Sequence, residues 1–500
     1  MTAPTDPTYR EVARHVRKYP PEELLREISR LAAAETHRRM RGSSVEPPET
    51  PFTFAGLART VIAESRLGRS DTAPGVGLGN RRVRTGRGRR RVGPEQVRAL
   101  CDEMIRLWSP DALTAADEDV GVIMASIAFE QFGSQWSAME NLSRAHSLFV
   151  DASKAHPSLP DSSEWAAELG VDLDGFLRTG FALHVAMVQN EGQVSRDLLR
   201  ASNVRPIWEP LTPDKFFNVV DTHFALDFME HRRRCRHAQQ AGWEKWSYSS
   251  LIASPLISFR DDLVCPAPHM LLDKVSSTGL WYIGQEAWRS RFTDALGPAF
   301  EDYIGQHLAL LEHAVVHPEI TYSTGKGSAS SCDWFVITED VVVLVEVKCA
   351  RPLYGYRLGD AAALEDVRAK VGGAVRQLEA TATLVRDRHP SFLDIPAERP
   401  LRGLVVTLEP YYVRETFRDH ILESDTLPVS IAWAHELENA CAQLRAEPDA
   451  GAQLLEALTP KASPLVVAGS LAGITHGKTP KRNPIVEASW DAWATWPAFD

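Results

Sequence analysis

The spacing of apolar residues changes character along the chain. In residues 8–42, and again from about 94 to 200, apolar positions recur three and four residues apart, which predicts amphipathic helices. From about residue 287, segments with helical spacing alternate with short apolar runs, which is typical of a mixed α/β domain. The pattern therefore predicts a mainly α-helical N-terminal region followed by an α/β C-terminal domain.

Interruptions of this pattern predict the limits of the domains. Residues 214–246 are expected to form one helical block, and residues 254–284 are expected to be short, strand-like and broken by prolines. The segments predicted are a helical pair with a flexible Arg-rich linker (1–95), an α-helical domain (96–250), a connector (251–286), the α/β domain (287–445) and a C-terminal extension (446–500).

Composition narrows the class of protein. A hydrophobic content of 44% and a charged content of 24% are typical of a soluble globular protein. No run approaches the roughly 20 apolar residues of a membrane span, and the N-terminus lacks the features of a secretory signal. The six cysteines are scattered without a close pair, which argues against a zinc or iron–sulfur site and suits the reducing cytoplasm.

Charge is distributed unevenly. The net charge is −11, whereas a protein that simply coats DNA is more often basic overall. Seven arginines nevertheless lie between positions 81 and 91, and four lie between 231 and 237. Local clusters of this kind bind nucleic-acid backbones, and a solvated surface is the alternative that the sequence leaves open. The candidate nucleic-acid contacts are Arg89, Arg90, Arg91, Arg232, Arg233 and Arg234.

One strand-forming stretch, SSCDWFVITEDVVVLVEVKCA at residues 330–350, contains three unexpected charges. Asp333, Glu346 and Lys348 lie in or beside valine-rich runs, where charges are costly to bury without compensation. Lysine is scarce in this chain, with 11 lysines against 44 arginines, so a lysine within an apolar strand is informative. The three charges call for an explanation in terms of geometry.

A hairpin provides that geometry. If Glu339 and Asp340 form the tip, Asp333 lies directly opposite Glu346 on the same face, with Cβ atoms about 5 Å apart. Lys348 shares this face because it follows Glu346 by two positions on one strand. A tip with an odd number of residues would break this register.

Two carboxylates this close repel each other unless a proton or a cation lies between them. Mg²⁺ prefers oxygen ligands, often one or two carboxylates with water and substrate phosphate. A protonated lysine is not a ligand, but it can orient or activate a water molecule or neutralise a phosphate in transition. These groups together are suited to hydrolysing a phosphodiester, and a structural ion pair of Lys348 is the alternative.

The pattern D-x12-E-x-K resembles the signature of the PD-(D/E)XK nuclease superfamily, although the residue before the aspartate is cysteine instead of proline. The resemblance extends from about residue 297 to 444. It implies a restriction-endonuclease-like domain, with a mixed central sheet flanked by helices. It also implies Mg²⁺ or Mn²⁺ held by Asp333, Glu346 and the backbone carbonyl of Val347, with Lys348 activating water.

The resemblance suggests two further site residues. Many members open with a helix that carries a metal-facing glutamate, and GPAFEDYIGQHL supplies Glu301. Many also carry a glutamine on the helix after the E-x-K strand, and VRQLEAT supplies Gln377. An ordinary surface position on a helix is the alternative for each of them.

The function expected from this resemblance is Mg²⁺-dependent cleavage of DNA by a cytoplasmic endonuclease, of the kind found in restriction or antiviral (phage) defence. A repair or recombination exonuclease, or a structure-specific nuclease, is an alternative, and RNA is a less favoured substrate. A third hypothesis is a non-catalytic protein that binds nucleic acid or a partner on a nuclease scaffold. A homo-oligomer or a partner protein from a defence system is compatible with each of them.

Overall fold

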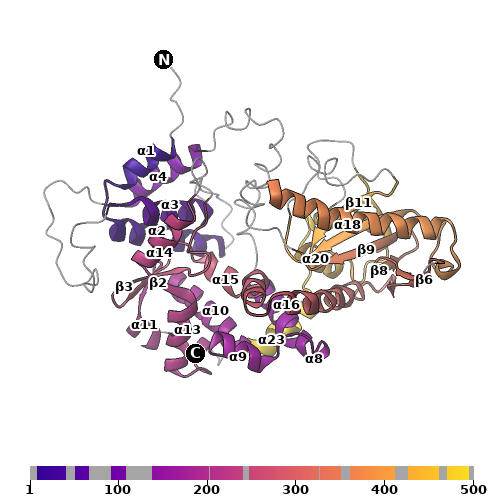
Figure 1. Ribbon diagram of the computed structural model, residues 1–500, viewed down its shortest axis with the longest axis horizontal. Helices are drawn as coiled ribbons and strands as arrows, with labels where there is room; N and C mark the ends of the chain where they lie inside the picture. Colours follow the sequence, from indigo (N-terminus) through magenta and orange to yellow (C-terminus); the bar gives the residue numbers. More distant parts are fainter. Residues whose placement is uncertain are drawn as a thin grey trace, which may run out of the picture.

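The computed structural model divides into a helical part and a part built on a sheet (Figure 1). The helix α16 (Ser277–Leu308) starts at the helical part and continues beneath the sheet. The structure describes residues 8–40, 51–66, 92–107, 138–201, 203–239, 247–325, 327–350, 361–411, 426–460 and 470–494.

The first helices pack together around one apolar core. They contribute Val16, Leu25, Leu57 and Leu100, which are all buried. The second helix starts with Pro21 in its first turn, where the missing N–H of proline costs nothing. These helices are α1 (Tyr9–Val16), α2 (Pro21–Met40), α3 (Pro51–Glu64), α4 (Pro94–Arg106) and α14 (Phe228–His237).

A larger core joins the remaining helices of the helical part to one face of the main sheet. Phe176 and Trp208 are among its fully buried side chains. The helical segments on this core are α7 (Ala138–His146), η1 (Ser147–Asp151), α8 (Ala152–Ala155), α9 (Ser162–Leu169), α10 (Leu173–Gln189), α11 (Arg196–Ala201), α12 (Arg205–Trp208), α13 (Pro213–Val219), η2 (Val220–Phe224) and α15 (His269–Val275).

The helical part also contains a small sheet, and the stretch 254–284 that was expected to be strand-like supplies two of its strands. Its strands are β1 (Gln193–Ser195), β2 (Ala225–Asp227), β3 (Leu256–Phe259) and β4 (Asp262–Val264), in the order β1-β4-β3-β2. The expected single helical block over 214–246 is therefore wrong, because β2 interrupts it. The second half of the stretch 254–284 is also not strand-like, because α15 and the start of α16 occupy it.

The main sheet has five strands in the order β11-β10-β9-β8-β5. The three strands β9, β10 and β11 are parallel, whereas β8 is antiparallel to β9 and to β5. The predicted mixed α/β character is confirmed. The strands are β5 (Val315–Pro318), β8 (Trp334–Ile337), β9 (Val342–Lys348), β10 (Leu401–Thr407) and β11 (Val429–Trp433), with a separate ribbon of β6 (Thr321–Ser323) and β7 (Ser328–Ser330).

Helices cover both faces of this sheet (Figure 1). On one face, Phe335, Leu344 and Val405 pack against Leu378 of α18 (Ala361–Arg386). The other face packs against α16 and α20 (Ala434–Leu444). The remaining elements are η3 (Pro390–Phe392), α21 (Ala450–Ala457), α22 (Ala472–Thr475) and α23 (Pro484–Trp493).

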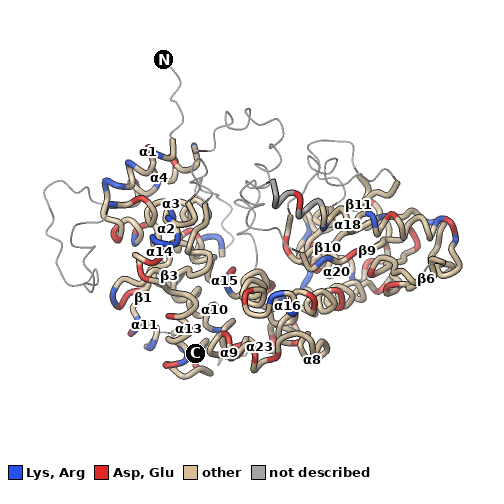
Figure 2. Tube along the Cα trace, viewed as in Figure 1, with Lys and Arg blue, Asp and Glu red and all other residues tan. Residues whose placement is uncertain are grey.

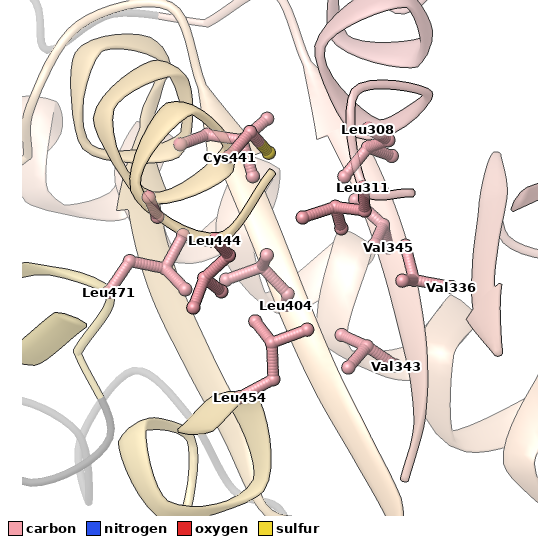
Figure 3. A pocket seen from close by; sticks show the side chains of 12 residues that line it. Leu308, Leu311, Val336, Val343, Val345, Leu404, Cys441, Leu444, Leu454 and Leu471 are labelled. Atoms are coloured by element: carbon pink, nitrogen blue, oxygen red, sulfur yellow. The ribbon is translucent and has the colours of Figure 1, made fainter. Parts of the chain in front are cut away.

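The face covered by α16 and α20 contains a small apolar cavity (Figure 3). Its volume is about 20 Å³, close to the space that one water molecule needs. Its walls include Val343 and Val345 of β9, whose side chains point away from the face that carries Glu346. Its lining side chains are aliphatic apart from Cys441, so the cavity is a packing gap and not the functional site.

The last helix that the structure describes, α23, packs back onto the helical part. In α23, Ser489 Oγ donates to the carbonyl of Ser143 at 3.0 Å, and Trp490 meets Phe181 edge to face. The segment expected as a C-terminal extension thus contributes to the same core as α7 and α10. None of the helices in the described ranges is long and apolar enough to cross a membrane.

Candidate active site

The hairpin of β8 and β9 has the predicted register. Trp334 pairs with Val345 and Ile337 pairs with Val342. The Thr338 N–H donates to the Val341 carbonyl at 3.0 Å, which leaves two residues, Glu339 and Asp340, at the tip. The even-numbered tip is therefore confirmed, and position 333 falls opposite position 346.

Asp333 lies just before β8 and reaches across to β9. Its Oδ2 accepts a hydrogen bond of 2.6 Å from the Val347 N–H. Burial raises the pKa of the Asp333 carboxyl, whereas this hydrogen bond and the charge of Lys348 lower it. The side chain is thus fixed beside the last residues of β9.

Glu346 is the most constrained of these side chains. It is fully buried, and its Oε1 accepts a hydrogen bond of 2.5 Å from Lys348 Nζ. Its Oε2 is buried without a hydrogen-bond partner. Burial, and then the negative charge of Asp333, raise the pKa of Glu346 to about 8 despite the opposing effect of Lys348. A buried carboxylate oxygen without a partner is costly, so this oxygen is an acceptor for a group that the protein itself does not supply.

Lys348 ends β9 with about a third of its side chain exposed. Burial lowers the pKa of its ammonium, but the contact with Glu346 more than offsets this, so the pKa is raised. The ammonium therefore stays protonated at neutral pH. It can donate to a water molecule or a phosphate, but it is not arranged to act as a base.

The helix α16 brings a third carboxylate to this end of the hairpin. Trp334 Nε1 donates to the backbone carbonyl of Glu301 at 3.2 Å. A Cβ at Gly305 would lie 2.2 Å from the Trp334 ring, so only glycine permits this close approach. Burial, followed by the charge of Asp333, raises the pKa of Glu301 to about 7, and Lys348 lowers it. Glu301 thus lies within electrostatic reach of both residues, near where the sequence expected it.

Gln377 supports the site from α18 without joining the charged cluster. Its Nε2 donates to the Ser331 carbonyl at 2.8 Å. One turn later, Thr381 Oγ1 accepts the N–H of Cys332 at 3.0 Å. Both ends of a single peptide group, two residues before Asp333, are therefore fixed by α18. The sequence analysis missed Thr381, although its spacing of four residues from Gln377 was available as a signal.

A divalent cation fits these donors chemically. Asp333, Glu346 and the Val347 carbonyl offer only oxygen atoms, which Mg²⁺ prefers, and one of these oxygens is buried and unsatisfied. Among the residues that the structure describes, however, no group of three or more His, Cys, Asp or Glu side chains is arranged to hold a metal. A cation at this hairpin would therefore depend on two carboxylates, a backbone carbonyl and water.

The structure describes three of the six arginines that were expected to contact nucleic acid. Arg232 is buried and donates to the Ile62 carbonyl and to Ser65 Oγ, both at 3.1 Å, so its predicted contact with nucleic acid is wrong. Arg233 is exposed and Arg234 is half-buried, and each pairs with Glu230 at 2.7 Å. Figure 2 shows basic residues interspersed with acidic ones around α14, the helix that carries these arginines. The residues Arg89, Arg90 and Arg91 lie outside the described ranges.

The site therefore consists of two opposed carboxylates, a lysine on the same face and a third carboxylate from α16. Its electrostatics are dominated by burial, which raises the pKa of all three carboxyl groups. Comparisons with protein-family models, with curated proteins and with solved structures found no match for this chain.

Proposed function

We propose that the chain is a Mg²⁺-dependent nuclease that hydrolyses phosphodiester bonds of DNA at the hairpin of β8 and β9. The proposal includes a restriction-endonuclease-like organisation of the sheet domain and a role in restriction or phage defence. It is supported by the hairpin register, which sets Asp333 opposite Glu346 and Lys348 on the same face. Mn²⁺ is an alternative cation.

The observation that carries the proposal is the buried Oε2 of Glu346. A carboxylate used only for an ion pair would have both oxygens satisfied or solvated, because the unpaired oxygen weakens the fold. Here one oxygen meets Lys348 and the other faces no donor. The unpaired oxygen of Glu346 is therefore explained if this carboxylate serves to bind a cation.

The protein groups have separate roles in this proposal. Asp333, Glu346 and the Val347 carbonyl would hold the cation, which when bound supplies charge neutralisation for the phosphate and lowers the pKa of bound water. Lys348, which stays protonated, donates to the attacking water and orients it, or donates to the phosphate. Glu301 would help to place the cation or a water molecule on the side of Asp333. Gln377 acts on the backbone and is a positioning residue.

The direct test is incubation of the purified chain with supercoiled plasmid DNA and Mg²⁺. Cleavage is expected for the wild type and is expected to be lost in Asp333→Asn, which keeps the shape of the side chain. Parallel assays on closed circular, linear and branched DNA, and on RNA, separate an endonuclease from an exonuclease or a structure-specific enzyme. Equal cleavage by wild type and Asp333→Asn would contradict the proposal.

A non-catalytic scaffold is the second candidate, favoured by one observation. The described residues contain no preformed group of three side chains that could hold a metal. Titration calorimetry with Mg²⁺ distinguishes the two candidates. Binding that disappears in both Asp333→Asn and Glu346→Gln supports the nuclease, whereas the scaffold predicts that the wild type shows no binding dependent on these residues.

A further inference from the structure

A buried ionic contact joins the helical part to the sheet part. Arg144 of α7 donates through Nε and Nη2 to the two carboxylate oxygens of Glu438 in α20, both at 2.6 Å. The side chains are only 3% and 1% exposed. Although burial raises the pKa of Glu438, Arg144 more than offsets this and lowers it to about 2. The pair is therefore ionised and bidentate in the interior, which fixes its geometry closely.

The same carboxylate also holds α16. Tyr303, which is buried, donates its hydroxyl to Glu438 Oε1 at 2.8 Å. Tyr303 follows Glu301 by two residues on α16, and the Glu301 carbonyl accepts the indole N–H of Trp334. The segment 301–305 is thus fastened on one side to the hairpin and on the other side to Glu438 and Arg144.

We propose that Arg144 and Tyr303 are positioning residues of the candidate active site, through which the helical part holds Glu301 against the hairpin. This inference rests on the proposed nuclease function. Its physical basis is that a buried, bidentate Arg–carboxylate pair adds little net stability but fixes the relative positions of the two side chains. Displacement of α16 would move the Glu301 carboxyl relative to Asp333 and Lys348. The helical part accordingly helps to set the geometry of the candidate active site without contributing a side chain to it.

Two variants interrupt this chain of contacts without leaving a charge unpaired. Tyr303→Phe removes the hydroxyl but keeps the ring and the Arg144–Glu438 pair. The double variant R144M/E438Q neutralises both partners together. Arg291→Ala is the matched control, because Arg291 also ties α16 to the helical part, through Glu164 of α9 at 2.5 Å, but at a solvent-exposed position.

The test measures kcat and KM for plasmid cleavage together with hydrogen–deuterium exchange of the full-length protein. Tyr303→Phe and R144M/E438Q are expected to lower kcat by about fivefold or more, the factor that one hydrogen bond is worth, with KM changed by less than about twofold. The amides of residues 301–306 and 331–337 are expected to exchange at least about fivefold faster. Arg291→Ala should leave both quantities unchanged.

The cleavage rate and the amide exchange rate together distinguish a failure of this inference from a failure of the proposed function. Folded variants with wild-type kcat and wild-type exchange at residues 301–306 and 331–337 would overturn the positioning role. If the wild type does not cleave, the proposed function fails, and the exchange of the same amides still decides whether Arg144 and Tyr303 hold α16 against the hairpin. Faster exchange with unchanged kcat would assign both residues to the fold alone and would also overturn the inference.

Discussion

Replacing Glu346 by glutamine should stabilise the protein while abolishing its activity. Glutamine keeps the shape of the side chain but cannot ionise. The carboxylate that it replaces is fully buried, lies opposite Asp333, and has one oxygen without a partner. If the function of this carboxylate is to bind a cation, its ionisation lowers the free energy of unfolding when no cation is bound, and the substitution removes that loss.

The magnitude follows from the raised pKa of Glu346, which is about 8 in place of 4.5. The folded state holds the proton more tightly than the unfolded state, so the stability contributed by this group is present below pH 4.5 and is lost as the pH rises towards 8. At pH 7 the loss amounts to at most about 3 kcal/mol. Glu346→Gln avoids this loss, and its advantage should therefore grow with pH.

The assay is thermal unfolding in EDTA at pH 5 and at pH 8. At pH 8 the variant should melt several degrees above the wild type, since about 1 kcal/mol shifts Tm by roughly 2–4 °C in domains of this size. At pH 5 the difference should be small. Added Mg²⁺ should raise the Tm of the wild type but not that of the variant, because only the wild type binds the cation.

The matched control is Glu438→Gln, in which the carboxylate removed is equally buried but is ionised and paired with Arg144. This control should destabilise the protein at both pH values, because it leaves a buried guanidinium without its counter-charge. Glu346→Gln behaving in the same way would show that Glu346 serves a structural ion pair with Lys348. That result would refute the reasoning.

Three further predictions concern α16, α18 and proton release. Arg289 interrupts α16 at φ 53° and ψ −128°, a conformation that favours glycine. Arg289→Gly should therefore raise the free energy of unfolding by about 1 kcal/mol in denaturant titrations, whereas Arg289→Ala should not. A glycine variant that is less stable than the wild type would contradict this. Gln377→Ala should lower the cleavage rate by about fivefold, because the peptide group between Ser331 and Cys332 loses one hydrogen bond, and an unchanged rate would contradict a positioning role. The pKa values of about 7 for Glu301 and about 8 for Glu346 mean that protons must leave as a cation binds, so calorimetric Mg²⁺ affinity should rise from pH 6 to pH 9; an affinity independent of pH would contradict this.

The parts of the fold that the sequence predicts are those with local signals. The register of β8 and β9 follows from a charged two-residue tip between apolar runs, and α18 follows from a long stretch with helical spacing. In the small sheet of the helical part, only β3 and β4 have such a signal, because they lie in the stretch expected to be strand-like. The other two strands, β1 and β2, are three residues long and pair with β4 and β3 from distant positions, so their pairing is decided by tertiary contacts.

The same distinction applies to the functional residues. Asp333, Glu346 and Lys348 were found because a single hairpin brings them together. The burial of Arg232 was missed because its acceptors belong to α3 and the residue after it, about 170 positions away. The contact of Arg144 with Glu438 spans 294 positions, and no periodic pattern indicates it. Long-range polar contacts of this kind become visible only in the folded chain.

The central claim, that the hairpin cleaves phosphodiester bonds with the help of Lys348, is tested most directly by one comparison. The single-turnover rate of plasmid cleavage in Mg²⁺ should be measured for the wild type and for Lys348→Ala, with folding checked by circular dichroism. We predict cleavage by the wild type and a loss of at least about a hundredfold in the variant, the scale of a positioned donor in a nuclease site. Equal rates for the two folded proteins would contradict the mechanism.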